Sequence, residues 1–349
     1  MLIKVDAASY CHTDAVLAAG QMPPNPPSFP HISCHEFAGT IVSLPTDSAN
    51  PDFKIGDRVG VPGRALHPCG KCTECASTSE EGHGGLNPDG PGYSVYCPYS
   101  KNNGIDSPGG FREYALVDAR QVTPLPENMS AVDASVLMCA GVTIYAAIKK
   151  CGLKPGQRVG IMGCGGGLGH LGLQFAAHMG LRVTGVDVAD GPLALAREVV
   201  AGRLDGKDVR VVDARVKEAG EVVKEVGTED KREDKGDMGL DAVVILPESQ
   251  KAFDYGVALL RNHGRCVVVS FPEKGFHVSA RDVVFRDISV LGSLVGSNRT
   301  LREMVQFAAE HGVKARIRTF PLSKLNELVE EYHKGDGGKL VVDMTLPDD

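Results

Sequence analysis

Residues 158–170 read RVGIMGCGGGLGH, a short apolar run that leads into a glycine-rich turn and then into a helical pattern. This order is typical of a dinucleotide-binding unit, because glycines let the backbone turn tightly and approach a pyrophosphate at the positive end of the helix. The spacing is not strictly G-x-G-x-x-G, since the last glycine falls one residue late. The predicted contacts to the nucleotide are Gly163, Gly165, Gly166, Gly167 and Gly169.

A carboxylate, Asp187, follows the next expected strand, residues 182–186. A carboxylate at this place accepts hydrogen bonds from both ribose hydroxyls of an adenosine and repels a 2′-phosphate. Val188, rather than an arginine, comes next. The sequence therefore favours NAD over NADP. The alternative interpretation of Asp187 is the N-cap of the helix that includes Gly191 and Pro192.

Strand-like and helical segments alternate on both sides of this turn, from about residue 130 to residue 269. The strands are apolar and β-branched, so the alternation predicts an α/β fold with a doubly wound parallel sheet of the Rossmann type. Residues 131–150 are predicted to be helical. The first 125 residues instead show short strand patterns between Pro and Gly turns, which predicts a β-rich domain. The last 55 residues carry two amphipathic helical patterns and a final strand.

The composition of the 349 residues, 42% hydrophobic and 23% charged, is that of an ordinary soluble globular protein, and the length favours two domains. The net charge of −7 offers no basic surface, so we expect no nucleic-acid partner and no anionic membrane surface. No apolar run approaches the roughly 18 residues of a membrane span. The first residues contain no long apolar segment, so secretion is not expected and a cytoplasmic protein is predicted.

Ten cysteines in such a chain are more often metal ligands or redox groups than a disulfide framework. Four of them lie in one short region: Cys69, Cys72, Cys75 and Cys97. The first three have C-x2-C-x2-C spacing, which suits one face of a tetrahedral zinc, and a fourth ligand is then required. We predict a structural zinc with Cys97 as that ligand, although His67 or His83 could take its place. The alternatives are a metal-free loop and a redox or other cluster.

A second set of metal-ligand residues is dispersed along the chain: Cys11, His35 and Cys139. Two thiolates and one imidazole with an open fourth position would form a catalytic rather than a structural zinc site. Sequence spacing does not show that these residues meet. Each cysteine, taken alone, is more often a small buried apolar residue than a ligand.

Several motifs together carry a family resemblance: CHTD at 11–14, HEFAG at 35–39, GDRV at 56–59, the cysteine cluster, CAGVT at 139–143 and GGLGH at 166–170. With them the chain resembles, essentially end to end, the zinc-dependent alcohol dehydrogenases of the medium-chain dehydrogenase/reductase superfamily. The resemblance implies a GroES-like catalytic domain over residues 1–140, a Rossmann NAD-binding domain over 141–293 and a return to the catalytic domain over 294–349. It also implies an active site in the cleft between the two domains.

The resemblance assigns roles around the catalytic zinc. Its ligands would be Cys11, His35 and Cys139, with Glu36 behind the metal as an occasional ligand. Asp14 would orient His35, as a carboxylate commonly does for a zinc-bound imidazole. Thr13 would take the proton of the alcohol and pass it to the nicotinamide ribose. The resemblance also adds four contacts to the cofactor: His12 and Lys339 at the pyrophosphate, Leu168 and Thr143 at the nicotinamide.

The sequence departs from the family pattern at several places. Val16 stands where many relatives end their proton relay with a histidine, and Cys34 replaces the glycine before the His-Glu pair. Lys339 replaces an arginine, which keeps the charge but not the bidentate fork. Only ten residues precede the CHTD motif, roughly thirty fewer than in relatives. We therefore expect a catalytic domain that is N-terminally shortened, whether the variant is genuine or its start codon is misassigned.

The predicted activity is reversible hydride transfer between an alcohol and NAD, which gives an aldehyde or a ketone. Two zinc ions per chain, one catalytic and one structural, and assembly as a homodimer or homotetramer are expected. The alternatives are an NADP-dependent reductase of the cinnamyl-alcohol type and a non-catalytic relic that binds zinc or nucleotide.

Overall fold

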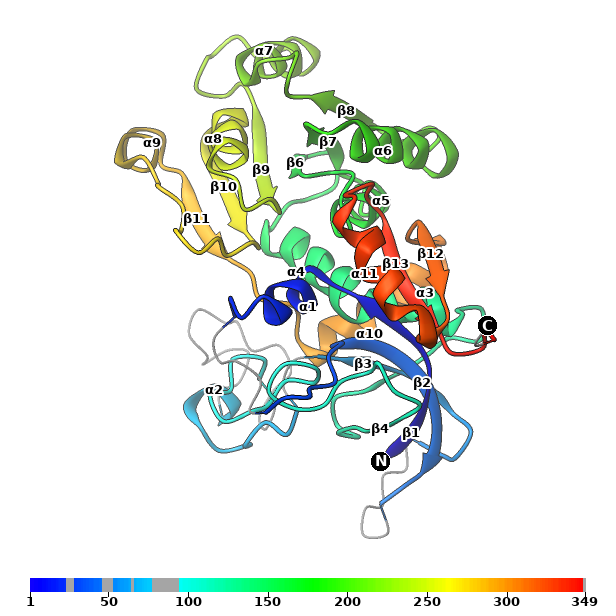
Figure 1. Ribbon diagram of the computed structural model, residues 1–349. Coiled ribbons are helices and arrows are strands. Elements are labelled where there is room, and N and C mark those ends of the chain that lie inside the picture. Colours follow the sequence, from blue (N-terminus) through cyan, green and yellow to red (C-terminus); the bar gives the residue numbers. More distant parts are fainter. Residues whose placement is uncertain (23–27, 46–52, 64–65, 77–93, 348–349) are drawn as a thin grey trace. The chain divides into compact units, whose positions relative to one another are not determined.

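The computed structural model describes residues 1–22, 28–45, 53–63, 66–76 and 94–347, which fold into two compact units (Figure 1). Unit 1 consists of Met1–Val142, Val295–Gly335 and Lys339–Asp349. Unit 2 consists of Thr143–Leu294 and Asp336–Gly338. The chain thus leaves unit 1 twice and returns to it each time, the second time after only the three residues 336–338.

Unit 1 is built on a seven-stranded, largely antiparallel sheet with the order β12-β13-β1-β2-β3-β5, in which β4 also pairs with β1. Its strands are β1 (Leu2–Tyr10), β2 (Glu36–Ser43), β3 (Arg58–Pro62), β4 (Tyr114–Leu116), β5 (Thr123–Pro124), β12 (Ile317–Phe320) and β13 (Lys339–Asp343). Its helices are α1 (His12–Ala18), α2 (Thr73–Ala76), α3 (Ala131–Val136), the π-helical η1 (Leu137–Gly141), α10 (Asn298–His311), the 3-10 turn η2 (Leu322–Lys324) and α11 (Leu325–His333). The core includes the fully buried Ile3, Val5 and Ile41.

The first strand is longer than its sequence pattern suggests. The apolar alternation ends near Val5, yet β1 continues to Tyr10 because Ala7 to Tyr10 pair with β13 from the other end of the chain. This pairing carries the strand up to Cys11, so the C-terminal return of the chain helps to place the first candidate metal ligand.

The predicted helix over residues 131–150 contains a π-helical turn. It runs through α3, η1 and then α4 (Val142–Lys150), and Cys139 lies within η1. A π turn adds a residue to the helical repeat and is frequent at functional sites. This helix also corrects the expectation that no segment is long and apolar enough to cross a membrane, because by length and composition alone it is. Since 72% of the window is buried inside the protein, it has the character of a core helix.

Unit 2 contains a six-stranded parallel sheet with the order β11-β10-β9-β6-β7-β8, which confirms the predicted doubly wound Rossmann fold. Its strands are β6 (Arg158–Met162), β7 (Arg182–Asp187), β8 (Val209–Asp213), β9 (Leu240–Ile245), β10 (Leu260–Val268) and β11 (Ser289–Gly292). Its helices, besides α4, are α5 (Gly169–His178), α6 (Asp190–Arg203), α7 (Ala219–Glu229), α8 (Gln250–Leu259) and α9 (Ala280–Arg286). The glycine-rich turn connects β6 to α5, as expected for a dinucleotide-binding unit.

Candidate metal and nucleotide sites

The structure brings Cys11, His35 and Cys139 together in unit 1. Cys11 follows β1, His35 precedes β2 and Cys139 belongs to η1, yet their ligand atoms all lie within 4.8 Å of one another. His35 Nε2 is 3.2 Å from Cys139 Sγ. We call this group the three-ligand cluster. Two thiolates and an imidazole that converge in this way are a donor set suited to zinc.

A buried carboxylate connects two of the segments that carry these ligands. Asp14, 3% exposed, accepts the backbone N–H of Cys11 on one oxygen and that of Cys34 on the other, both at 2.9 Å. Its Oδ1 is 3.8 Å from His35 Nδ1, too far for a hydrogen bond. The buried Nδ1 has no hydrogen-bond partner among the described residues. The carboxylate therefore fixes the backbone of the cluster and lies near the imidazole.

Glu36 lies behind the cluster with its carboxylate fully buried. It accepts hydrogen bonds from Ser9 Oγ at 2.9 Å and from the backbone N–H of Ala140 at 3.2 Å, and it forms an ion pair with Lys339. Burial raises the pKa of Glu36, although the Lys339 ammonium opposes this shift. The carboxylate thus joins β1, η1 and β13 next to the ligands His35 and Cys139.

Lys339 has a different partner from the one predicted. We expected it at the pyrophosphate of the cofactor, but its ammonium is buried, pairs with Glu36 and donates to the carbonyl of Tyr10 at 2.9 Å. Its side chain is only 5% exposed. In the structure Lys339 therefore neutralises the carboxylate of Glu36 behind the three-ligand cluster. The comparison of Lys339 with the arginine of relatives did not indicate this role.

Two residues of the three-ligand cluster, Cys11 and His35, have pKa values that are shifted from the ordinary ones. A hydrogen bond from Cys139 lowers the pKa of Cys11 well below its ordinary value, against the effect of burial. Burial would lower the pKa of His35, but the negative charge of Cys11 and the proximity of Asp14 raise it well above its ordinary value. A stabilised Cys11 thiolate is the form that binds a metal.

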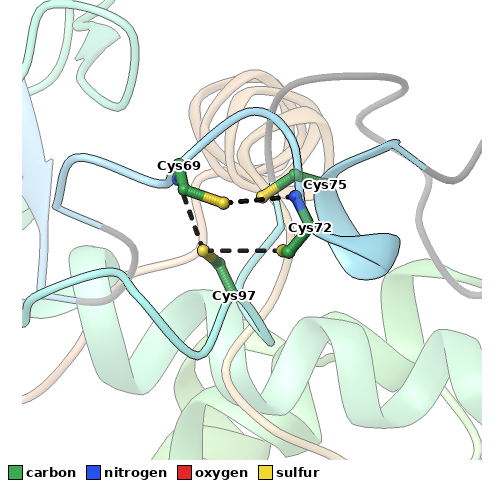
Figure 2. Close-up of side chains that lie close together, drawn as sticks. All are labelled: Cys69, Cys72, Cys75 and Cys97. Carbon is green, nitrogen blue, oxygen red and sulfur yellow. Dashed lines mark hydrogen bonds between the residues drawn. The ribbon is translucent and has the colours of Figure 1, made fainter.

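The second group of cysteines is compact, with all four ligand atoms within 4.8 Å of one another, and Figure 2 shows the side chains of Cys69, Cys72, Cys75 and Cys97 close together. The Sγ of Cys69 accepts the backbone N–H of Cys72 at 3.3 Å, and the Sγ of Cys97 accepts that of Cys69 at 3.3 Å. Backbone N–H groups lower the pKa of Cys69 to about 6. We call this group the four-cysteine cluster, and its donors suit a tetrahedral structural zinc.

Among the residues that the structure describes, Cys97 is the one that joins Cys69, Cys72 and Cys75 in this cluster. His67 lies nearby in sequence, but its Nδ1 is 3.2 Å from Asp118 and its side chain is 69% exposed. His83 lies outside the described residues.

A pocket of about 420 Å³ opens in unit 2 beside the glycine-rich turn. It is lined by Met162, Gly163, Val186, Asp187, Val188, Ala214, Arg215, Pro247, Ser249, Lys251, Ala252 and Tyr255. Asp187 accepts the backbone N–H of Gly165 at 3.0 Å, so the carboxylate and the turn form one structure. It is not the N-cap of α6, a position that Ala189 holds.

Glycine is required where this turn packs closely. A Cβ on Gly165 would lie 1.8 Å from the carbonyl oxygen of Pro192, and one on Gly169 would lie 2.0 Å from that of Gly163. Gly166 and Gly167 complete the turn, and Leu168 stands at the N-cap of α5. The glycines thus let the turn pack tightly and lead directly into α5, whose N-terminus is where a pyrophosphate is expected.

The remaining predicted site residues are divided between the units. In unit 1, Thr13 Oγ1 is 3.9 Å from Cys11 Sγ, and His12 Nδ1 is 2.8 Å from the hydroxyl of Tyr332 on α11. Thr143 begins unit 2 and is 7% exposed. Sequence reasoning missed Tyr332, and it missed Arg215, Lys251 and Tyr255 in the nucleotide pocket. None of these four belongs to a local motif, so a single sequence held no signal for them.

Comparison with known proteins places this geometry in a family. Residues 1–127 match the profile of the alcohol dehydrogenase GroES-like domain, and residues 167–310 match that of the zinc-binding dehydrogenases. An alcohol dehydrogenase of Geobacillus stearothermophilus is 34% identical over 344 residues, which cover 98% of this chain and 91% of the relative. The chain belongs to the zinc-dependent alcohol dehydrogenases. It is thus an oxidoreductase of the medium-chain dehydrogenase/reductase superfamily, as the motifs predicted.

Solved structures of similar fold hold either nicotinamide cofactor. Acetophenone reductase from Geotrichum candidum, in complex with NAD, superposes with a TM-score of 0.75 at 25% identity, covering 98% of this chain and 89% of that one. CAD from Helicobacter pylori, in complex with NADP(H), has a TM-score of 0.77 at 23% identity, covering 99% and 91%. The fold is therefore compatible with both cofactors.

Proposed function

We propose that this zinc-dependent alcohol dehydrogenase transfers hydride reversibly between an alcohol and NAD, with a catalytic zinc at the three-ligand cluster and a structural zinc at the four-cysteine cluster. The observation that carries the proposal is the convergence of Cys11, His35 and Cys139 from three separate elements. Three protein ligands leave one coordination position for a substrate, whereas four cysteines leave none.

The residues around the three-ligand cluster have different proposed roles in the reaction. Cys11, His35 and Cys139 would hold a zinc, which would supply Lewis-acid polarisation of the alcohol oxygen, and a nicotinamide cofactor would supply the hydride acceptor. Thr13 Oγ1, beside Cys11, accepts the hydroxyl proton of the substrate. Asp14 accepts hydrogen bonds from the backbone N–H groups of Cys11 and Cys34, and Glu36 accepts one from Ala140 in η1. Both carboxylates thus fix the backbone that carries the ligands. Val16 offers no further proton acceptor. Thr13 would therefore have to release its own hydroxyl proton toward solvent as it accepts that of the substrate.

The nucleotide pocket supports NAD as the cofactor. Asp187 lines the pocket and presents a negative charge where the adenosine ribose is expected. Two cations, Arg215 and Lys251, line the same pocket and would favour a 2′-phosphate. Arg215, however, is engaged with Asp213 and Asp190. Asp187 and this ion pairing together favour NAD, and an NADP-dependent reductase is the second candidate.

We also propose that the enzyme forms a homodimer or a homotetramer in the cytoplasm, without nucleic-acid or membrane partners. β11 stands at an edge of the parallel sheet, and Val284 and Phe285 on the adjacent α9 are 72% and 80% exposed. An open strand edge beside exposed apolar side chains suits pairing with a second copy. A reducing compartment fits ten cysteines that are all free thiols.

A panel of alcohols and aldehydes with NAD(H) and NADP(H), together with zinc content per chain, tests the proposal. We expect turnover with NAD(H) and two zinc ions per chain. Replacement of Asp187 with serine should raise the relative use of NADP, since it removes the charge that repels a 2′-phosphate. Preference of the native enzyme for NADP would contradict the cofactor assignment. Absence of turnover with either cofactor would favour the non-catalytic alternative.

A further inference from the structure

Arg215 is held by a bidentate ion pair at the wall of the nucleotide pocket. Its Nε donates to Asp213 Oδ1 at 2.9 Å and its Nη2 to Asp213 Oδ2 at 2.7 Å. The same Nη2 also donates to Asp190 Oδ1 at 2.6 Å. Asp213 is 13% exposed at its side chain and Asp190 is 88% exposed, so Asp213 is the better shielded partner. Arg215 lowers the pKa of Asp213 to about 2, in keeping with a persistent pair.

Sheet register brings this pair next to Asp187. Asp187 at the end of β7 pairs with Asp213 at the end of β8, and the backbone N–H of Ala214 donates to the carbonyl of Asp187 at 3.0 Å. Neighbouring parallel strands lie about 4.8 Å apart. Arg215 is therefore two residues after Asp213, the strand neighbour of Asp187. Asp187 is the carboxylate that we assign to the adenosine ribose, and Asp187 and Arg215 line the same pocket.

A guanidinium at this place has the chemistry of a phosphate ligand. Its planar fork binds a phosphomonoester as it binds a carboxylate, through two parallel N–H···O bonds. In the structure that fork faces Asp213 instead. Asp213 thus acts twice: it adds negative charge beside Asp187, and it occupies the donors that a 2′-phosphate would use.

We infer that Arg215 is a latent ligand for the 2′-phosphate of a nucleotide, kept occupied by Asp213 and, from the solvent side, by Asp190. The inference rests on the proposed assignment of this pocket to the adenosine end of the cofactor. Two carboxylates would then select against a 2′-phosphate: Asp187 repels it, and Asp213 keeps Arg215 from binding it.

Binding of two nicotinamide-free ligands to the full chain tests this without turnover. Calorimetry would give the dissociation constants of ADP-ribose and of 2′-phospho-ADP-ribose for five proteins: the native chain, Arg215→Ala, Asp187→Ser, Asp187→Ser with Asp213→Asn, and that double variant with Arg215→Ala. Asparagine keeps the size of Asp213 and removes its charge. The affinity for ADP-ribose and the thermal midpoint report whether the pocket stays folded.

We expect Asp187→Ser to improve the affinity for the 2′-phospho ligand relative to ADP-ribose by about tenfold, equivalent to ~1.4 kcal/mol. Asp213→Asn should add about another tenfold, because the fork is released. Arg215→Ala should reverse that second gain. In the native background, Arg215→Ala should change the ratio of the two dissociation constants far less, since the guanidinium is paired with Asp213 there.

Two results would overturn the inference. If the gain in relative affinity from Asp213→Asn survives Arg215→Ala, Asp213 acts only through its charge. If Arg215→Ala weakens 2′-phospho-ADP-ribose equally in the native and the double-variant backgrounds, the arginine is not held back. Should Asp213→Asn fail to fold, Asp190→Asn releases one of the two partners and should give a smaller gain of the same sign. A native chain that prefers the 2′-phospho ligand, with Arg215→Ala neutral, would refute the NAD proposal but not the occupied arginine.

Discussion

The three-ligand cluster and the four-cysteine cluster use the same thiol chemistry in opposite settings. Cys11 directly follows β1, His35 directly precedes β2 and Cys139 lies in η1, so the ligands are separated by up to 128 residues and only the folded unit brings them together. The four cysteines lie within residues 69–97 around one short helix, where local backbone N–H groups already contact the sulfur atoms.

The polar surroundings differ as well. Behind the three-ligand cluster lie buried charges, Asp14, Glu36 and Lys339, and a hydroxyl, Thr13, lies beside it. Such groups hold an open metal position in place and move protons near it. Around the four-cysteine cluster the structure shows mainly thiols and backbone N–H donors, which suits a loop closed by a metal. The contrast predicts that one cluster controls chemistry and the other controls stability.

The largest expected effect follows from removing a ligand of the three-ligand cluster. Cys139→Ala should abolish turnover and lower the zinc content from two to one per chain, because the site loses one of three protein ligands. The protein should remain folded, since Cys139 sits in a helix whose other residues form the core. Steady-state kinetics, metal analysis and a thermal melt measure the three quantities. If turnover persists at one zinc per chain, the catalytic assignment of this cluster is wrong.

A smaller but still large effect is expected at Thr13. Thr13→Ala should reduce turnover by roughly 10²–10⁴-fold, the loss typical of a proton-transfer group, because Val16 offers no substitute. Thr13→Ser should retain most activity, since it keeps the hydroxyl. Zinc content and the thermal midpoint are the controls. If instead Thr13→Ala only lowers stability, by roughly 1 kcal/mol, and each folded, zinc-loaded molecule turns over at the native rate, then Thr13 merely supports the start of α1.

The two clusters also show how far sequence reasoning reaches. The four-cysteine cluster was visible in its spacing, because a loop of about thirty residues closes on itself at modest entropic cost. The dispersed ligands were identified only through the family motifs, since no local pattern reports that β1 and η1 meet. The Rossmann sheet was predictable from its alternating apolar segments. The extension of β1 to Tyr10 and the burial of Lys339 against Glu36 were not, because each depends on partners far away in the sequence. The π turn at Cys139 was not predicted either, because the residues around it read as a continuous helix.

The third effect should appear in stability rather than in turnover. Cys72→Ala should lower the thermal midpoint by several degrees, at about 2–4 °C for each kcal/mol lost, because metal binding in such a loop contributes folding free energy. The rate per folded, loaded molecule should stay nearly unchanged. Differential scanning calorimetry and metal analysis, with Cys139→Ala as the matched variant, compare the clusters directly. An unchanged midpoint together with two zinc ions per chain would show that the four-cysteine cluster holds no structural metal.

The smallest effect tests whether the backbone beside the three-ligand cluster is strained. Cys34, next to His35, is fully buried and has a φ of +79°, a left-handed conformation that costs an L-residue roughly 1–2 kcal/mol relative to glycine. Its carbonyl oxygen packs so closely that a Cβ on Gly109 would lie 2.1 Å away, so the backbone has little room to relax. Cys34→Ala keeps the strain and loses the contacts of the sulfur. Cys34→Gly loses slightly more contact but removes the strain.

We therefore expect Cys34→Gly to be more stable than Cys34→Ala by about 1 kcal/mol, the reverse of the usual order for these two residues. Cys266 in β10 is a matched control, because it is equally buried and has no positive φ. There the alanine variant should be the more stable one. Urea unfolding of the four variants measures both differences. If glycine is less stable than alanine at both positions, the turn before His35 carries no strain that glycine can relieve.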